Sequence, residues 1–183
     1  MTQTYGITLL LLATLSANLQ DGQSAGACRL ETKYDRFADI TTVQCDLVES
    51  GDSPARLTVQ ANASFHGKDP NETAKFWLSL SSNRGGATRR TKPSFQEATT
   101  LYLSMESTRL EIPVSDYGAA FYELVRSFSE SARAEISRED LRKLLKAKSL
   151  KGEWGGVEFK FSDAALASLR DFVSRQIFAT NDR

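Results

Sequence analysis

The chain has 183 residues, of which 40% are hydrophobic and 25% charged. Its 23 basic and 23 acidic residues cancel to a formal net charge of zero. These values are ordinary for a folded protein and exclude a strongly basic nucleic-acid binder and a highly charged disordered chain. The length suits one domain.

The N-terminal segment has the pattern of an export signal. Residues 7–15 form an uncharged apolar run, far shorter than the roughly 20 residues that a membrane-spanning helix needs. Small residues follow, with a cleavage pattern at Ala25-Gly26-Ala27 and a weaker one at Leu15-Ser16-Ala17. We therefore expect a signal peptide over 1–27 and one exported β-rich domain over 28–183, periplasmic or secreted, although the leader lacks Lys and Arg.

The two cysteines leave two interpretations open. In an oxidising compartment Cys28 and Cys45 are expected to form a disulfide, and a hairpin folded about Arg36-Phe37 places them opposite each other. Alternatively, Cys28 follows a small-residue tripeptide and resembles the lipidated cysteine of bacterial lipoproteins. Only in that second case do we expect a membrane anchor.

Most of the chain after Cys28 has the two-residue alternation of half-buried strands. Residues 29–48 are expected to form two strands, and 50–54 a turn. The longest loop is predicted at 83–97. Residues 117–128 fit either a helix or a strand, and the surrounding strands favour a strand. Further strands are predicted at 56–65, 74–82, 99–105 and 109–114.

The C-terminal part is predicted to contain two helices separated by a short hairpin. Ser137 is a suitable N-cap for a helix ending near Lys148, and Ser162 caps a second helix with an apolar stripe. Glycines within 149–161 indicate a hairpin between them. The fold class predicted is α+β, with an antiparallel meander of about seven to nine strands and two C-terminal helices packed on it.

Two segments resemble a group of uncharacterised exported bacterial proteins. These are YDRFADITTV, in the first hairpin, and EISREDLRKLLKAKSLKGEWGGVEFKFSDAALASLRDF, which spans the helix–hairpin–helix segment. The likeness covers most of residues 31–175 and implies export and an α+β fold, but it brings no activity. The cysteine pair and the basic residues of 84–92 depart from that group's pattern.

Little in the sequence indicates catalysis. His66 is the one histidine, so a metal centre or a histidine-based nucleophilic site is not expected. We found no nucleotide-binding or nucleophile motif and predict no catalytic residue, metal or cofactor. The alternative is an extracytoplasmic enzyme that uses two of four clustered carboxylates, Glu106, Glu111, Asp116 and Glu123.

One loop is a candidate binding site. Arg84, Arg89, Arg90 and Lys92 surround a Gly-Gly pair, and clustered cations of this kind hold anions such as phosphate, sulfated sugars or lipid headgroups. A solvated surface loop has the same composition. The sequence therefore predicts an exported, non-enzymatic binding or envelope-associated module, whose partner is an unknown protein or anionic ligand and not nucleic acid.

Overall fold

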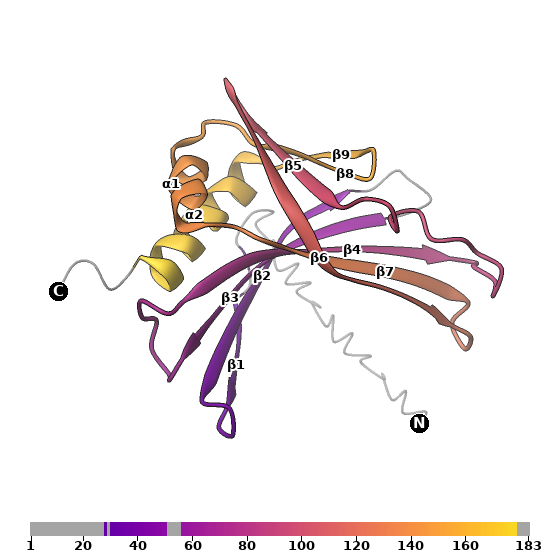
Figure 1. Ribbon diagram of the computed structural model, residues 1–183, viewed down its shortest axis with the longest axis horizontal. Coiled ribbons are helices and arrows are strands. Elements are labelled where there is room, and N and C mark those ends of the chain that lie inside the picture. Colours follow the sequence, from indigo (N-terminus) through magenta and orange to yellow (C-terminus); the bar gives the residue numbers. More distant parts are fainter. Residues whose placement is uncertain (1–27, 29, 51–55, 179–183) are drawn as a thin grey trace, which may run out of the picture.

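The computed structural model describes residues 28, 30–50 and 56–178, so the predicted leader and most of the turn predicted at 50–54 lie outside it. Nine antiparallel strands form one sheet in the order β1-β2-β3-β4-β7-β6-β5-β8-β9, with two helices (Figure 1). The predicted fold class is confirmed. The strands are β1 (Glu31–Asp35), β2 (Ile40–Ser50), β3 (Arg56–His66), β4 (Lys75–Gly85), β5 (Thr100–Met105), β6 (Thr108–Tyr122), β7 (Ser127–Glu135), β8 (Lys151–Trp154) and β9 (Val157–Lys160), and the helices are α1 (Arg138–Lys146) and α2 (Asp163–Ile177).

The sheet has an inner apolar face and an outer polar face. In β3, Leu57, Val59 and Ala61 are fully buried, while the alternate residues Thr58 and Gln60 remain partly exposed. The buried stripe of α2 packs over β2, β3 and β4 on the inner face. Burial of these apolar side chains is the main favourable term that holds the helix on the sheet.

β6 is much longer than predicted and joins the two halves of the sheet. Its first half pairs with β5, and from Val114 on it pairs with β7, with a bulge between Ser115 and Gly118. The strand favoured for 117–128 is present as far as Tyr122, followed by a turn into β7. The apolar residues at helical spacing do not form a buried stripe, because Leu124 is exposed.

The connection between β4 and β5 is not a simple hairpin. β4 pairs with β7, whereas β5 lies on the far side of β6. Residues 86–99 therefore carry the chain past two strands, and these residues form the predicted long loop, shifted because β4 runs to Gly85.

The Cys28–Cys45 disulfide is present, with its Cα atoms 5.5 Å apart, but it does not sit within the first hairpin as predicted. Glu31 lies opposite Gln44, so the turn falls at 36–39 and the expected register is wrong by two residues. Cys28 precedes β1, and its N–H donates to Ser168 Oγ on α2 at 3.2 Å. The bridge thus ties the entering chain to the inner face.

The disulfide also bears on the compartment. A sulfur atom in a disulfide cannot carry a lipid thioether, so the bridge disfavours lipidation of Cys28. Disulfides persist in oxidising compartments, which indicates a location outside the cytosol. None of the helices formed by the described residues is both long and apolar enough to cross a membrane.

Both predicted helix caps are confirmed. Ser137 Oγ accepts a hydrogen bond from Asp140 N at 3.1 Å, and Ser162 Oγ accepts one from Ala165 N at 3.1 Å. The predicted hairpin between the helices is β8–β9. There, a Cβ on Gly152 would lie 2.1 Å from the Phe159 ring, so only glycine fits.

Candidate functional site

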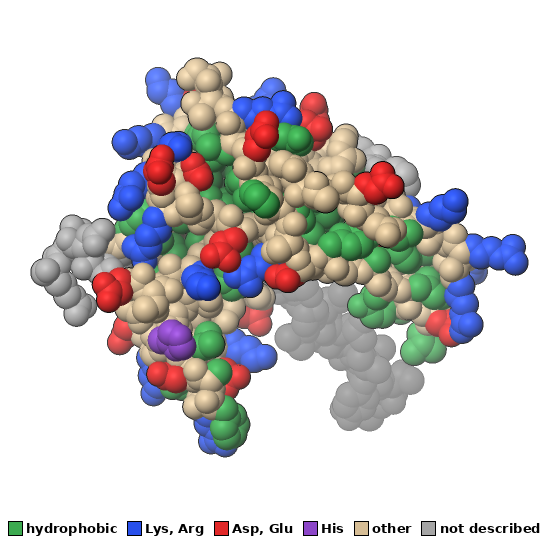
Figure 2. Space-filling model, viewed as in Figure 1, with side chains coloured by type: hydrophobic (Ala, Val, Ile, Leu, Met, Phe, Trp, Pro, Cys, Tyr) green, Lys and Arg blue, Asp and Glu red, His purple; other side chains and the backbone are tan. Residues whose placement is uncertain are grey.

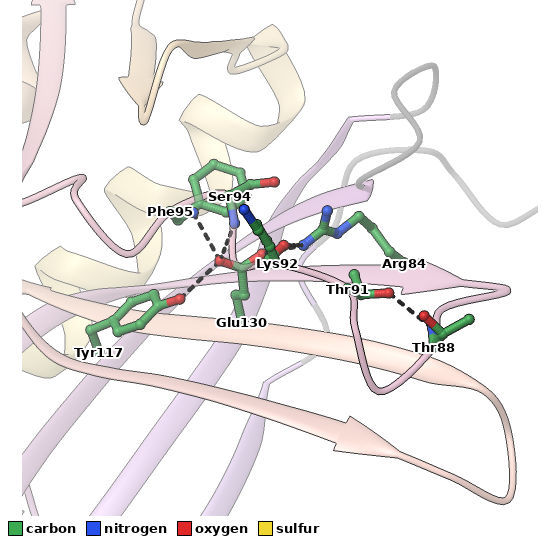
Figure 3. Close-up of polar contacts among 8 residues, drawn as sticks. All are labelled: Arg84, Thr88, Thr91, Lys92, Ser94, Phe95, Tyr117 and Glu130. Carbon is green, nitrogen blue, oxygen red and sulfur yellow. Dashed lines mark hydrogen bonds and ion pairs between the residues drawn. The ribbon is translucent and has the colours of Figure 1, made fainter.

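The basic loop is built around a buried carboxylate that the sequence analysis missed. Glu130 on β7 is 1% exposed and faces inward, where four donors converge on it (Figure 3). Its Oε1 accepts from Ser94 N and Phe95 N at 2.8 Å and from the Tyr117 hydroxyl at 2.9 Å. Its Oε2 pairs with Arg84 at 3.0 Å. These bonds satisfy a buried charge that would otherwise be strongly destabilising.

Tyr117 belongs to this network from the neighbouring strand. Burial, together with the hydrogen bond to the Glu130 carboxylate, raises its pKa to about 12. The hydroxyl therefore stays protonated and acts as a donor over the ordinary pH range.

The same loop closes one end of the core. Phe95 stacks on Trp154 with ring centroids 4.2 Å apart and an interplanar angle of 11°. Trp154 Nε1 also donates to Ala98 O at 3.1 Å. Phe95 thus anchors the loop in the packed interior, and Trp154 is a core residue.

The four residues predicted to bind an anion do not converge on one point. Arg84 lies inside and pairs with Glu130, and its Nη2 also donates to Lys92 O at 2.8 Å. Arg89 pairs with Glu123 at 2.7 Å on the surface. Arg90 and Lys92 are exposed. Anion binding by the loop stays a prediction, and the exposed Arg90 and Lys92 are the residues that still support it.

The four carboxylates proposed for an enzyme are placed in different parts of the fold. Glu106 accepts from Ser149 N at 2.7 Å, and this backbone hydrogen bond lowers its pKa. Glu111 is exposed on β6, and Glu123 pairs with Arg89. Asp116 sits in the β6 bulge with φ of 53°. The proposed pair is therefore not assembled from these residues.

His66 ends β3 as an exposed residue, as its loop-like sequence context suggested. Over residues 28, 30–50 and 56–178, no three His, Cys, Asp or Glu side chains are grouped in a way that would hold a metal ion.

A different set of polar side chains comes together on the outer face, turned away from the helices. It consists of six residues from four adjacent strands, which we term the polar ladder: Glu31, Gln44, Asp46, Gln60, Asn62 and Ser79. Its hydrogen bonds join Gln44 Nε2 to Glu31 Oε2 at 2.7 Å, Gln60 Nε2 to Asp46 Oδ1 at 2.8 Å and Asn62 Nδ2 to Ser79 Oγ at 3.0 Å. Cross-strand pairing therefore orients amides and carboxylates in a row.

Two open hollows follow this ladder and meet at Gln60. The larger, of about 530 Å³, is lined by both ladder carboxylates, Glu31 and Asp46. The smaller, of about 310 Å³, extends over β4 and β7, where Arg133 lies over the Trp77 ring at 4.0 Å from its centroid. The two hollows share Gln60 on the outer face, and we call them together the ladder groove.

The sequence contained partial signals for both features. Ala132 and Ala134 alternate on the buried face of β7, and the same alternation places Glu130 inward. The ladder residues occupy the polar positions of alternating strands, but their pairing depends on cross-strand register.

Comparison of the chain with protein-family models, curated proteins and solved structures finds no match. The geometry of the chain itself therefore carries the functional argument.

Proposed function

We propose that the chain is an exported, non-enzymatic binding module and that the ladder groove holds a hydroxyl-rich ligand, a saccharide. The observation that carries this proposal is the meeting of both hollows at Gln60, between ladder residues from four strands.

The amide and carboxylate groups of the polar ladder suit a ligand rich in hydroxyl groups. A carboxamide both donates and accepts, and a carboxylate accepts, so Gln44, Gln60 and Asp46 match the donor and acceptor character of neighbouring hydroxyls. Trp77 adds an aromatic side chain beside them, and the part of its ring that Arg133 leaves uncovered suits the apolar C–H face of a sugar ring. Side chains held by one another's hydrogen bonds lose less entropy when a ligand binds.

A carboxylate enzyme is the second candidate, because Glu31 and Asp46 line one hollow. Binding is favoured because both side chains are exposed and each accepts from an amide. A general acid in a glycosidase-type pair needs surroundings that keep it protonated, such as an apolar pocket.

The test is binding of the exported protein to a glycan array and to soluble polysaccharides by affinity electrophoresis. Gln60→Ala is expected to lower affinity for the selected glycan about tenfold, since it removes the group shared by both hollows. Gln96→Ala, an exposed glutamine outside the groove, is the matched control and is expected to bind normally. Equal affinity of both variants, or no glycan bound at all, would contradict the proposal.

Turnover separates the two candidates. Release of reducing ends from a bound glycan, abolished by Asp46→Asn or Glu31→Gln, would make the protein an enzyme. Binding without turnover supports the module.

Export to a periplasmic or extracellular location is also part of this proposal. It is supported by the leader pattern and by the disulfide. Intact mass of the exported protein before and after reduction is expected to show a chain lacking its leader, with two thiols that react only after reduction.

A further inference from the structure

The β6–β7 hairpin ends in three hydrophobic side chains that lie outside the core. Leu124 is fully exposed, Val125 is 69% exposed and Tyr122 is 55% exposed. A hydrogen bond from Arg126 N to Glu123 O at 3.2 Å closes the turn that presents them. We call Tyr122, Leu124 and Val125 the apolar apex. Exposure of adjacent large apolar side chains typically marks an interaction site.

Cations surround this apex. The neighbouring loop is held against the turn by a hydrogen bond from Ala87 N to Arg126 O at 2.8 Å. Within residues 86–92 and 122–126, Glu123 is the one carboxylate. Figure 2 shows Lys and Arg side chains gathered with hydrophobic ones at this end of the molecule, on the right. We call the cations here the basic rim, which comprises Arg89, Arg90, Lys92 and Arg126.

We propose that this end of the molecule docks on an anionic lipid bilayer. The apolar apex enters the boundary between headgroups and acyl chains, and the basic rim contacts headgroup phosphates. A hairpin end that carries exposed apolar side chains beside cations offers both kinds of contact that an anionic bilayer surface makes. Tyrosine is favoured at that boundary, and cations near it are attracted to acidic lipids.

This inference goes beyond saccharide binding, because it uses residues outside the ladder groove. It also gives the predicted anion-binding loop a specific partner, through the outward-facing Arg90 and Lys92 rather than through Arg84, which is paired with Glu130.

A second copy of the chain is a weaker occupant. The apolar hollow of about 420 Å³ beside α2 has space for an apex, but Asp171 is the one carboxylate that lines it. Arg90, Lys92 and Arg126 would then be poorly matched, whereas acidic lipid headgroups match them; Arg89 is already paired with Glu123.

The experiment is co-sedimentation of the exported protein with vesicles of phosphatidylcholine alone or mixed with phosphatidylglycerol at about three to one. We expect binding to the mixed vesicles that weakens with added salt and is at least about tenfold weaker on phosphatidylcholine alone.

Three variants locate the contact. Leu124→Ser with Val125→Ser is expected to weaken binding at least about tenfold, and Arg89→Ser with Arg90→Ser to weaken it and remove most of its salt dependence. Phe37→Ser is the matched control, because Phe37 is equally exposed at the β1–β2 turn, far from the basic rim. It is expected to bind as the wild type does.

Three results would overturn the proposal. The first is a wild type that ignores the mixed vesicles. The second is equal loss of binding in the Phe37 variant and the apex variant. The third is a wild-type dimer in sedimentation velocity that the apex variant converts to monomer without any vesicle binding, which would assign the apex to a second copy. Near-ultraviolet circular dichroism checks that each variant is folded.

Discussion

Glu130 on the inner face of the sheet and Glu31 and Asp46 on its outer face are all carboxylates, but they differ in burial and in the number of hydrogen bonds that they accept. Glu130 is enclosed, and its oxygens accept from four donors that belong to three separate segments of the chain. Glu31 and Asp46 are exposed, and each accepts from one neighbouring amide. The inner carboxylate is committed to holding a loop in place, whereas the outer ones have lone pairs left for a ligand. The face of the sheet thus decides whether a carboxylate is enclosed by donors or left accessible to solvent.

The largest expected effect concerns the inner carboxylate. Glu130→Gln leaves Arg84, 20% exposed, without its counter-charge, and we expect the free energy of unfolding to fall by about 3 kcal/mol. Urea denaturation at neutral pH measures it. Glu111→Gln, an exposed carboxylate on β6, is the control and should change stability by less than about 0.5 kcal/mol. Similar losses in the two variants would mean that the network does not hold the loop.

A smaller effect is expected at Tyr117, and it depends on pH. The folded protein raises the pKa of Tyr117 from 10.0 to about 12, so the folded state favours the protonated hydroxyl. Its contribution is complete below the unfolded pKa and is lost as pH rises through the folded pKa. The free energy of unfolding should therefore fall between about pH 10 and 12 more steeply in the wild type than in Tyr117→Phe.

The same substitution is expected to cost about 1 kcal/mol at neutral pH, through loss of the hydrogen bond to Glu130. Urea titrations at several pH values measure both effects. Tyr122→Phe, at the exposed hairpin end, is the control and should keep the wild-type pH dependence. Parallel pH profiles for wild type and Tyr117→Phe would remove Tyr117 from the buried network.

The smallest effect on stability is expected on the outer face. Glu31→Gln and Asp46→Asn should each change the free energy of unfolding by less than about 0.5 kcal/mol, because both groups are exposed. Thermal unfolding measures this change, and glycan affinity should fall in the same variants. A stability loss approaching that of Glu130→Gln would show that both faces use their carboxylates structurally.

Prediction from sequence succeeded where the signal is local. The Ser137 and Ser162 caps, the alternation of β3 and the β8–β9 hairpin all depend on neighbours within a few residues. It was less successful for β6, whose second half lacks a buried face and therefore does not alternate clearly. The loop cations were identified, but their pairing with Glu130 and Glu123 was not, because those partners lie 46 and 34 residues further along the chain.

By itself the sequence determined the inward face of the clearly alternating strands and the starts of both helices, since the two-residue strand period and the helix caps are properties of adjacent residues. It also indicated the disulfide as one of two interpretations, because two cysteines allow a single pairing. Only the tertiary structure decided the strand order, the path of the loop over β7 and β6, and the two-residue register that sets Glu31 opposite Gln44. A shift by two residues keeps every side chain on its face and changes only its partners, so hydrophobic patterning cannot detect it. The ladder groove and the enclosure of Glu130 both depend on such partners, and long-range packing alone selects them.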